Sequence, residues 1–115
     1  MPEDSHTIPP AQALPLATLI TPTERGIASR VLAKTSCGNV TLFVFDAGQG
    51  LEEHTSPFDA IVMVLEGSLT LTIGDTGVRA TPGTIVRMPG GVPHALDAPE
   101  PARMLLVMLR ERKDA

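Results

Sequence analysis

The segment AIVMVLEGSLTLTIGDTG, residues 60–77, carries the clearest fold signal in the chain. Its middle part, SLTLTI, alternates strictly between a hydroxyl side chain and an aliphatic one. This period of two residues is typical of a strand with one face in the core and the other in water. Gly67 separates this run from the apolar run before it, and the GDTG at 74–77 turns the chain back. Residues 59–81 are therefore predicted to form consecutive antiparallel strands.

Short β-rich runs of this kind continue through most of the chain from Ile27 onward. Gly, Pro, Asn and Asp separate them at the spacing expected of a sandwich or barrel. No segment combines helical periodicity with caps, and the best candidate, PAQALPLATLI at 10–20, is interrupted by Pro15. The sequence therefore predicts an all-β fold with little helix. Strands are expected near 27–33, 40–46, 59–66, 68–73, 77–81, 84–88, 94–98 and 102–109.

The N-terminal segment, residues 1–25, differs in composition from the rest. It holds five of the eleven prolines, which remove sheet donors and block helix interiors, so it is predicted to be an arm. Its leucines and isoleucines are too apolar for a solvated tail. We expect the arm to lie against the barrel or a partner subunit, with disorder only up to about Pro10. The barrel is then expected over 26–110 and a charged tail over 111–115.

Size and charge narrow the range of functions. A chain of 115 residues supports a single core, and nine basic residues against thirteen acidic ones disfavour nucleic acid or an anionic membrane as partners. No apolar run approaches the roughly 18 residues of a membrane span. The single Cys37 forms no intrachain disulfide, and no leader-like segment opens the sequence, so a cytoplasmic setting is expected. Cys37 has no nearby His or basic residue to activate it and is predicted to be inert.

Two stretches share a regular spacing of glycine, proline and histidine. The spacings resemble the two motifs of the cupin family, written G-x5-H-x-H-x(3,4)-E-x6-G and G-x5-P-x-G-x2-H-x3-N, and the resemblance covers about residues 40–109. The chain resembles small single-domain members of the RmlC-like cupin superfamily, which have the type-2 conserved barrel. This resemblance implies a double-stranded β-helix or jelly-roll barrel of six to eight strands. The seven matching positions are Gly48, His54, Gly67, Gly83, Pro89, Gly91 and His94.

The departures from these motifs bear on function. Metal-binding cupins supply His, His and Glu from the first motif and His from the second, and here only His54 and His94 remain. Ser56 replaces the second His and Ala60 replaces the Glu. Serine is a poor ligand for a divalent transition metal, and alanine offers no donor. Asp59 is kept as a further candidate ligand, although it lies one position early and on the face opposite Ala60 if the chain is extended there.

Three interpretations of the two histidines stay open at this stage. They hold a divalent metal (Fe, Mn, Ni or Zn) weakly, they line a pocket filled by water or a small molecule, or they are a structural pair. We expect His54 and His94 to face each other across the barrel interior. The pocket wall is predicted from strand parity and from apolar methionines. It comprises Ser56, Ala60, Val62, Met63, Val64, Met88, Leu96, Ala98 and Met104.

A pocket of this composition suits a small, largely apolar molecule with one polar handle. It has no arginine or lysine cluster for a phosphorylated sugar. The leading hypothesis is a stand-alone bacterial-type cupin that binds such a molecule, with or without a metal. The alternative is a metal-dependent enzyme, similar to a dioxygenase or isomerase, that uses His54, His94 and one carboxylate or waters. A purely structural assembly role is the third class, and a homodimer is expected.

Overall fold

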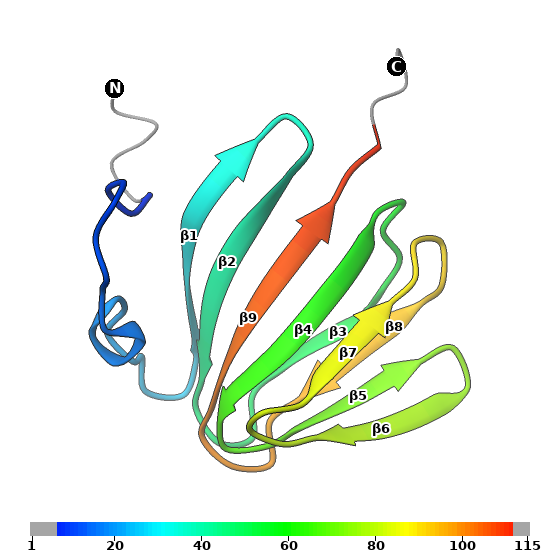
Figure 1. Ribbon diagram of the computed structural model, residues 1–115. Coiled ribbons are helices and arrows are strands. Elements are labelled where there is room, and N and C mark those ends of the chain that lie inside the picture. The colour runs from blue at the N-terminus through cyan, green and yellow to red at the C-terminus, as the bar shows by residue number, and fades with distance from the viewer. Residues whose placement is uncertain (1–6, 112–115) are drawn as a thin grey trace.

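Nine strands make up most of the computed structural model, which describes residues 7–111 (Figure 1). The one helical element in this part of the chain is a 3-10 turn, η2 (Leu16–Thr18). The prediction of an all-β fold with little helix is thus confirmed. The strands are β1 (Ile27–Thr35), β2 (Gly38–Phe45), β3 (Gly50–His54), β4 (Asp59–Glu66), β5 (Leu69–Ile73), β6 (Thr76–Ala80), β7 (Ile85–Met88), β8 (His94–Asp97) and β9 (Ala102–Leu109).

The strands form two antiparallel sheets that face each other (Figure 1). The larger sheet has the order β1-β2-β9-β4-β7, and the smaller has the order β3-β8-β5-β6. The segments after β2, β3, β4, β6, β7 and β8 all pass from one sheet to the other, so strands distant in sequence become neighbours. This arrangement is the double-stranded β-helix, or jelly roll, that the resemblance to cupins implies.

The sequence prediction missed one strand, β3. Its sequence GLEEH lacks alternation, and four of its five residues are exposed. The strand exists because it pairs with β8, through Gly50 with Asp97, Leu51 with Leu96 and His54 with His94, with a bulge between Leu51 and His54. The expected six to eight strands are therefore nine, and His54 lies at the end of a strand.

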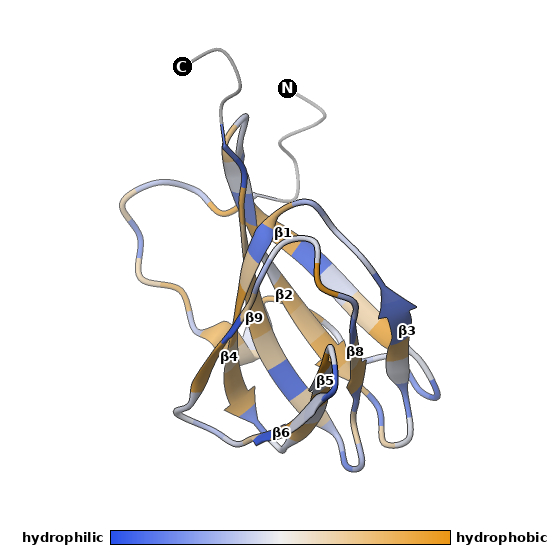
Figure 2. Cartoon of the chain, turned by 90° about the vertical axis from the view of Figure 1, so that its right-hand side faces the viewer, coloured by the Kyte–Doolittle hydropathy of each residue, from blue (hydrophilic) through white to orange (hydrophobic). Residues whose placement is uncertain are grey.

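Apolar side chains from both sheets fill the space between them. In β4, Ala60, Val62 and Val64 are buried, whereas Ile61 and Met63, which alternate with them, are partly exposed. Figure 2 shows the apolar character of β4 and β9, which lie side by side in the larger sheet. This core is continuous from one sheet to the other, so the barrel holds together through apolar burial.

The arm is attached to the larger sheet of its own chain. The N–H of Ile8 donates to the carbonyl oxygen of Leu32 at 2.8 Å, and Arg30 Nη1 donates to the carbonyl oxygen of Leu19 at 2.8 Å. Figure 1 shows the arm running beside β1. The predicted arm and tail extend to residues 1–6 and 112–115, which lie outside the described residues.

The arm covers apolar side chains on the outer face of β1 and β2. Leu42 and Val44 are at most 6% exposed, although they alternate along β2 with Phe45, which belongs to the barrel core, and Phe43, which packs against it. Leu32 on β1 is equally buried and is also outside that core. Because sheet neighbours alone cover only the edges of such side chains, the arm supplies the burial on this side.

No helix within residues 7–111 is long and apolar enough to cross a membrane.

Candidate functional site

The two motif histidines are neighbours on the smaller sheet. His54 ends β3, His94 begins β8, and the two residues are register partners. Their rings meet edge to face, with centroids 4.3 Å apart and planes at 68°. The expectation that they face each other across the interior is therefore wrong, because they belong to adjacent strands of one sheet. His94 is buried and His54 is exposed, so His54 forms the rim of this end of the barrel.

Both imidazoles use their Nδ1 atom in the same way. Nδ1 of His54 lies 2.9 Å from the carbonyl oxygen of Glu52, and Nδ1 of His94 lies 3.2 Å from that of Val92. A carbonyl oxygen only accepts hydrogen bonds, so Nδ1 carries the proton in each ring. In the neutral imidazole the lone pair is then on Nε2. Two adjacent strands thus present two Nε2 acceptors.

Two connections between the sheets close this histidine end of the barrel, one after β3 and one after β7. They are joined by the N–H of Gly91, which donates to the carbonyl oxygen of Ser56 at 2.7 Å. The hydroxyl of Ser56 accepts from the N–H of Phe58 at 3.2 Å, which stabilises a local turn. Ser56, predicted as a pocket residue, therefore uses its side chain within its own loop.

Asp59 lies at the same end but on the outer face of the larger sheet. Its register partner on β9 is Leu109, and the next residue, Ala60, faces the interior. The carboxylate accepts from the N–H of Gly90 at 2.8 Å and from Arg87 Nε at 3.3 Å. The Gly90 N–H, together with the Arg87 guanidinium, holds the pKa of Asp59 below its ordinary value. The carboxylate is thus engaged away from the two histidines.

The donor set does not match that of a metal centre with three protein ligands. Among residues 7–111, no group of three or more His, Cys, Asp or Glu side chains is placed to hold a metal ion. Catalytic zinc and non-haem iron sites use three such ligands. Here His54 and His94 supply two imidazole nitrogens, and Ala60 occupies the position of the missing carboxylate without any donor atom.

Most predicted pocket residues are part of the packed core. Of these, Ala60 and Met88 are register partners at the histidine end, whereas Ala98 lies at the other end, where its N–H and carbonyl bond to Gln49 and Gly48. The predicted pocket residues that belong to this core, each at most 4% exposed, are Ala60, Val62, Val64, Met88, Leu96, Ala98 and Met104.

Met63 lies on the opposite face of β4. It alternates with Val62 and Val64, which point into the core, and its register partners are Ile85 and Leu105 on the outer face. The prediction of Met63 as a pocket residue is therefore wrong. It followed the residue type, whereas strand parity decides the direction of the side chain.

Sequence reasoning missed two polar side chains on the inner face at the histidine end. Asn39 and Thr41 are register partners of Met108 and Leu106 and alternate along β2 in phase with the core residue Phe43. Thr41 is 8% exposed, and its hydroxyl donates to Oδ1 of Asn39 at 3.1 Å. The sequence of residues 39–45 could have indicated this, because both polar residues alternate in phase with the two phenylalanines and therefore share their face of the strand.

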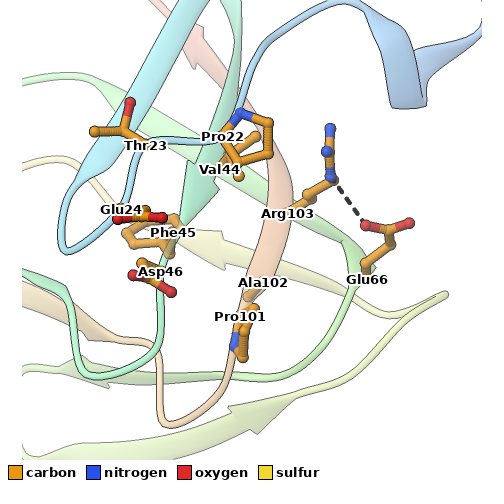
Figure 3. A pocket seen from close by; sticks show the side chains of 10 residues that line it. All are labelled: Pro22, Thr23, Glu24, Val44, Phe45, Asp46, Glu66, Pro101, Ala102 and Arg103. Carbon is orange, nitrogen blue, oxygen red and sulfur yellow. Dashed lines mark ion pairs between the residues drawn. The ribbon is translucent and has the colours of Figure 1, made fainter.

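A separate hollow of about 270 Å³ lies at the opposite end, between the arm and the larger sheet (Figure 3). Three of its four charged residues are engaged in holding the structure together. Glu66 Oε2 pairs with Arg103 Nε at 2.9 Å, and Asp46 accepts from the N–H groups of Arg25 at 2.6 Å and Ala47 at 2.9 Å. These two N–H donors, Arg25 first, hold the pKa of Asp46 below its ordinary value. The histidine end remains the better candidate site.

Known proteins resemble this chain over nearly all of its length. The cupin domain family matches residues 41–108. A conserved protein of unknown function from Streptococcus pyogenes is 35% identical, with 91% of this chain and 92% of that chain covered and a TM-score of 0.85. A cupin superfamily protein from Desulfitobacterium hafniense is 27% identical, with 90% and 95% covered and a TM-score of 0.83. No curated protein matches the sequence.

The matched region runs from within β2 to within β9 and contains both glycine–histidine motifs. The likeness to the two solved structures extends beyond this region to about nine-tenths of the chain. These matches agree with the jelly-roll topology and with the motif spacing. The chain therefore belongs to the cupin family, with a cupin domain over residues 41–108.

Proposed function

We propose that the protein binds a small, largely apolar molecule at the histidine end of the barrel and that the polar handle of this ligand is a hydrogen-bond donor such as a hydroxyl group. One observation carries the proposal. The rings of His54 and His94 are in contact, and a backbone carbonyl engages Nδ1 of each ring, which leaves Nε2 of each neutral ring as an acceptor. Acceptors of this kind select for a donor on the ligand.

The surroundings of the histidines support an apolar ligand body. Ala60 and Met88 pair on the inner face at this end, and Met108 is the partner of Ala60 on β9. Asn39 and Thr41 add polar groups on the facing sheet. Small-molecule sites commonly combine an apolar wall with a few convergent polar groups. Each ligand hydrogen bond is expected to contribute about 0.5–1.5 kcal/mol, or roughly two- to tenfold in affinity.

The metal-dependent enzyme, dioxygenase-like or isomerase-like, remains the alternative function. It would use the same two Nε2 atoms, with waters or another group to complete the coordination. The donor set of the described residues does not fit a three-ligand centre, so the binding module is the better supported of the two. No chemical step is assigned to the site.

We also propose a cytoplasmic setting. Cys37 is the only cysteine of the chain, and its thiol is free and exposed in the β1–β2 turn. In an oxidising compartment such a thiol would form intermolecular disulfides or oxidise further. A reducing compartment keeps it as a thiol.

Matched ligand pairs test the proposed site. Phenol and anisole share an aromatic ring, but only phenol has a hydrogen-bond donor. Calorimetric titration of the purified chain with each compound therefore measures how much the donor contributes to affinity. We expect phenol to bind more tightly, by roughly two- to tenfold. His54→Ala and His94→Ala should remove this difference, whereas His6→Ala, a change at the third histidine, should keep it. Equal affinity for phenol and anisole, or a preference that survives both site variants, would contradict the proposal.

A further inference from the structure

A guanidinium group lies at the histidine end of the barrel, directly after β9. The N–H of Arg110 donates to the carbonyl oxygen of Cys37 at 2.7 Å, so the pairing of β2 with β9 continues one residue beyond the strand. In an extended chain, side chains two residues apart share a face. Arg110 therefore shares the face of Met108, whose register partner Ala60 belongs to the core. This places the guanidinium on the inner side of the larger sheet, at the rim of the histidine end.

The guanidinium of Arg110 is stacked on the ring of Phe58. Its Cζ atom lies over this ring, 4.9 Å from the centroid. Phe58 comes directly before β4, and the pairing of Asp59 with Leu109, continued by one residue, sets Phe58 opposite Arg110. Figure 1 shows the start of β4 and the end of β9 at the same end of the barrel. A cation–π contact uses the face of the guanidinium, whereas its N–H bonds lie in its plane. The stack thus orients the group and leaves its donors available.

These N–H donors have no acceptor within residues 7–111. Nε of Arg110 is buried without a hydrogen-bond partner, whereas the two Nη atoms reach the surface. The carboxylates that form ion pairs in this part of the chain are held by other arginines, Asp59 by Arg87 and Glu66 by Arg103. A buried donor without an acceptor is destabilising, and each such group in a folded protein calls for an explanation. A negatively charged acceptor on a ligand provides one.

The charges on the two sheets orient such a ligand. Glu52 and Glu53 are exposed on β3, next to His54, so a negative charge is disfavoured on the smaller sheet. Arg110 places a positive charge on the larger sheet. A planar guanidinium matches the two oxygens of a carboxylate, whereas a phosphate group brings up to two negative charges for this single cation. The arrangement therefore favours a carboxylate near Arg110 and a neutral donor near the histidines.

We propose that the ligand of the histidine end carries a carboxylate group, which the Nη atoms of Arg110 bind. The inference rests on the proposed function, because that function places the hydroxyl of the ligand at His54 and His94. The ligand class is then a small hydroxy acid whose apolar or aromatic body lies between the two polar groups. The net charge of −4 repels small anions on average, so the selectivity for an acid comes from Arg110 itself.

Acids and their primary amides form matched ligand pairs for this proposal. The amide keeps the shape of the carboxylate but has no charge, and at pH 7 the acid is ionised. Calorimetric titration uses 4-hydroxybenzoate, 4-hydroxyphenylacetate and 3-(4-hydroxyphenyl)propionate, each against its amide, so that the span between the two polar groups varies. We expect the acid of at least one pair to bind the wild type about tenfold more tightly or better, because hydrogen bonds to charged groups are the strong ones.

Variants assign this preference to one side chain. Arg110→Gln should reduce the preference for the acid to about twofold or less. Lys34→Gln is the matched control, because Lys34 is an exposed cation on β1 of the same sheet and its register partner is Asn39. Two strand spacings, about 10 Å, separate β1 from β9, and salt at 0.15 M screens charges at this distance. Lys34→Gln should therefore keep the preference, and melting curves check that the variants are folded.

Equal affinity for acid and amide in all three pairs would overturn the proposal, as would a preference that survives Arg110→Gln. If Arg110→Gln does not fold, Arg110→Lys carries the test. It keeps the charge without the planar fork, and an undiminished preference in this variant would contradict the proposal.

The outcome for the proposed function can be read separately. A preference for phenol over anisole that depends on the two histidines, without any preference for acids, would overturn the assignment of Arg110 alone. A preference for acids that Arg110→Gln removes, without a preference for phenol, would support Arg110 and reject the hydroxyl at the histidines.

Discussion

The carboxylate of Asp59, the first residue of β4, accepts a hydrogen bond from the N–H of Gly90 at 2.8 Å. This bond and the one from Gly91 to Ser56 join the connection that follows His54 to the connection that precedes His94. Gly90 is closely packed, because a Cβ atom at this position would lie 2.6 Å from the carbonyl oxygen of Pro57. The two motifs are therefore linked through their loops as well as through the pairing of β3 with β8.

Replacement of this carboxylate should change how stability depends on pH. The pKa of Asp59 is lowered in the folded chain relative to 3.8, so its contribution to stability is present above 3.8 and is lost as the pH falls through the lower folded value. Thermal unfolding should show Asp59→Asn less stable than the wild type at neutral pH, with a difference that shrinks below pH 3.8. The control is Asp75→Asn, at an exposed turn residue. A difference that stays constant down to the lowest pH would contradict this expectation.

Two glycines separate the cost of dihedral strain from the cost of a steric clash. Gly67 and Gly91 have φ values of 70° and 79°, in the left-handed region that favours glycine. A Cβ atom at Gly67 would also collide with the backbone of Pro101 and Ala102, whereas at Gly91 it would meet nothing within 4 Å. Gly91→Ala should lower the free energy of unfolding by about 1 kcal/mol, and Gly67→Ala by about 2–4 kcal/mol. Denaturant unfolding measures both, and equal losses would show that the backbone near Pro101 yields freely.

Restoring the two missing ligands of the first motif should create a metal site. In Ser56→His/Ala60→Glu, the new carboxylate starts from a buried position on the inner face, so the metal-free variant should unfold at a lower temperature than the wild type. Zn²⁺ or Mn²⁺ should then raise the melting temperature. At a metal concentration one hundred times Kd, the free energy of unfolding should increase by about 2.7 kcal/mol. The same pair of changes with His94→Ala serves as the control and should respond much less. If Zn²⁺ or Mn²⁺ stabilises the wild type equally, the two histidines already hold metal.

Removal of the arm should expose the outer side of β1 and β2. Deletion of residues 1–22 uncovers Leu32, Leu42 and Val44, and each fully buried aliphatic side chain of this size is worth about 1.5–3 kcal/mol. We expect a large loss of stability in denaturant unfolding and increased binding of a hydrophobic dye. Deletion of residues 1–6 keeps the bond from Ile8 to Leu32 and should have a much smaller effect. An arm deletion with unchanged unfolding would mean that the sheet face tolerates exposure.

The sequence predicted the strands whose signal is local. The alternation in β4 and β5 and the glycines around them identified these elements, because a side-chain period of two depends only on the backbone conformation of the segment itself. Strand β3 was not predicted because GLEEH has no such period. Its conformation comes from pairing with β8, which is far away in sequence. The strand that positions His54 was thus the one that local pattern alone did not identify.

The resemblance of the two motifs to those of the cupin family implied the jelly-roll fold, and it singled out His54 and His94, whose rings are in contact in the structure. The tertiary structure alone decided that both rings lie on one sheet with Nδ1 engaged by backbone carbonyls, and that the carboxylate of Asp59 bonds away from them. The physical reason is that spacing along the chain reports local geometry, whereas the register between distant strands is set by closing both sheets around one core. That register determines which polar atoms meet and which lone pairs remain available.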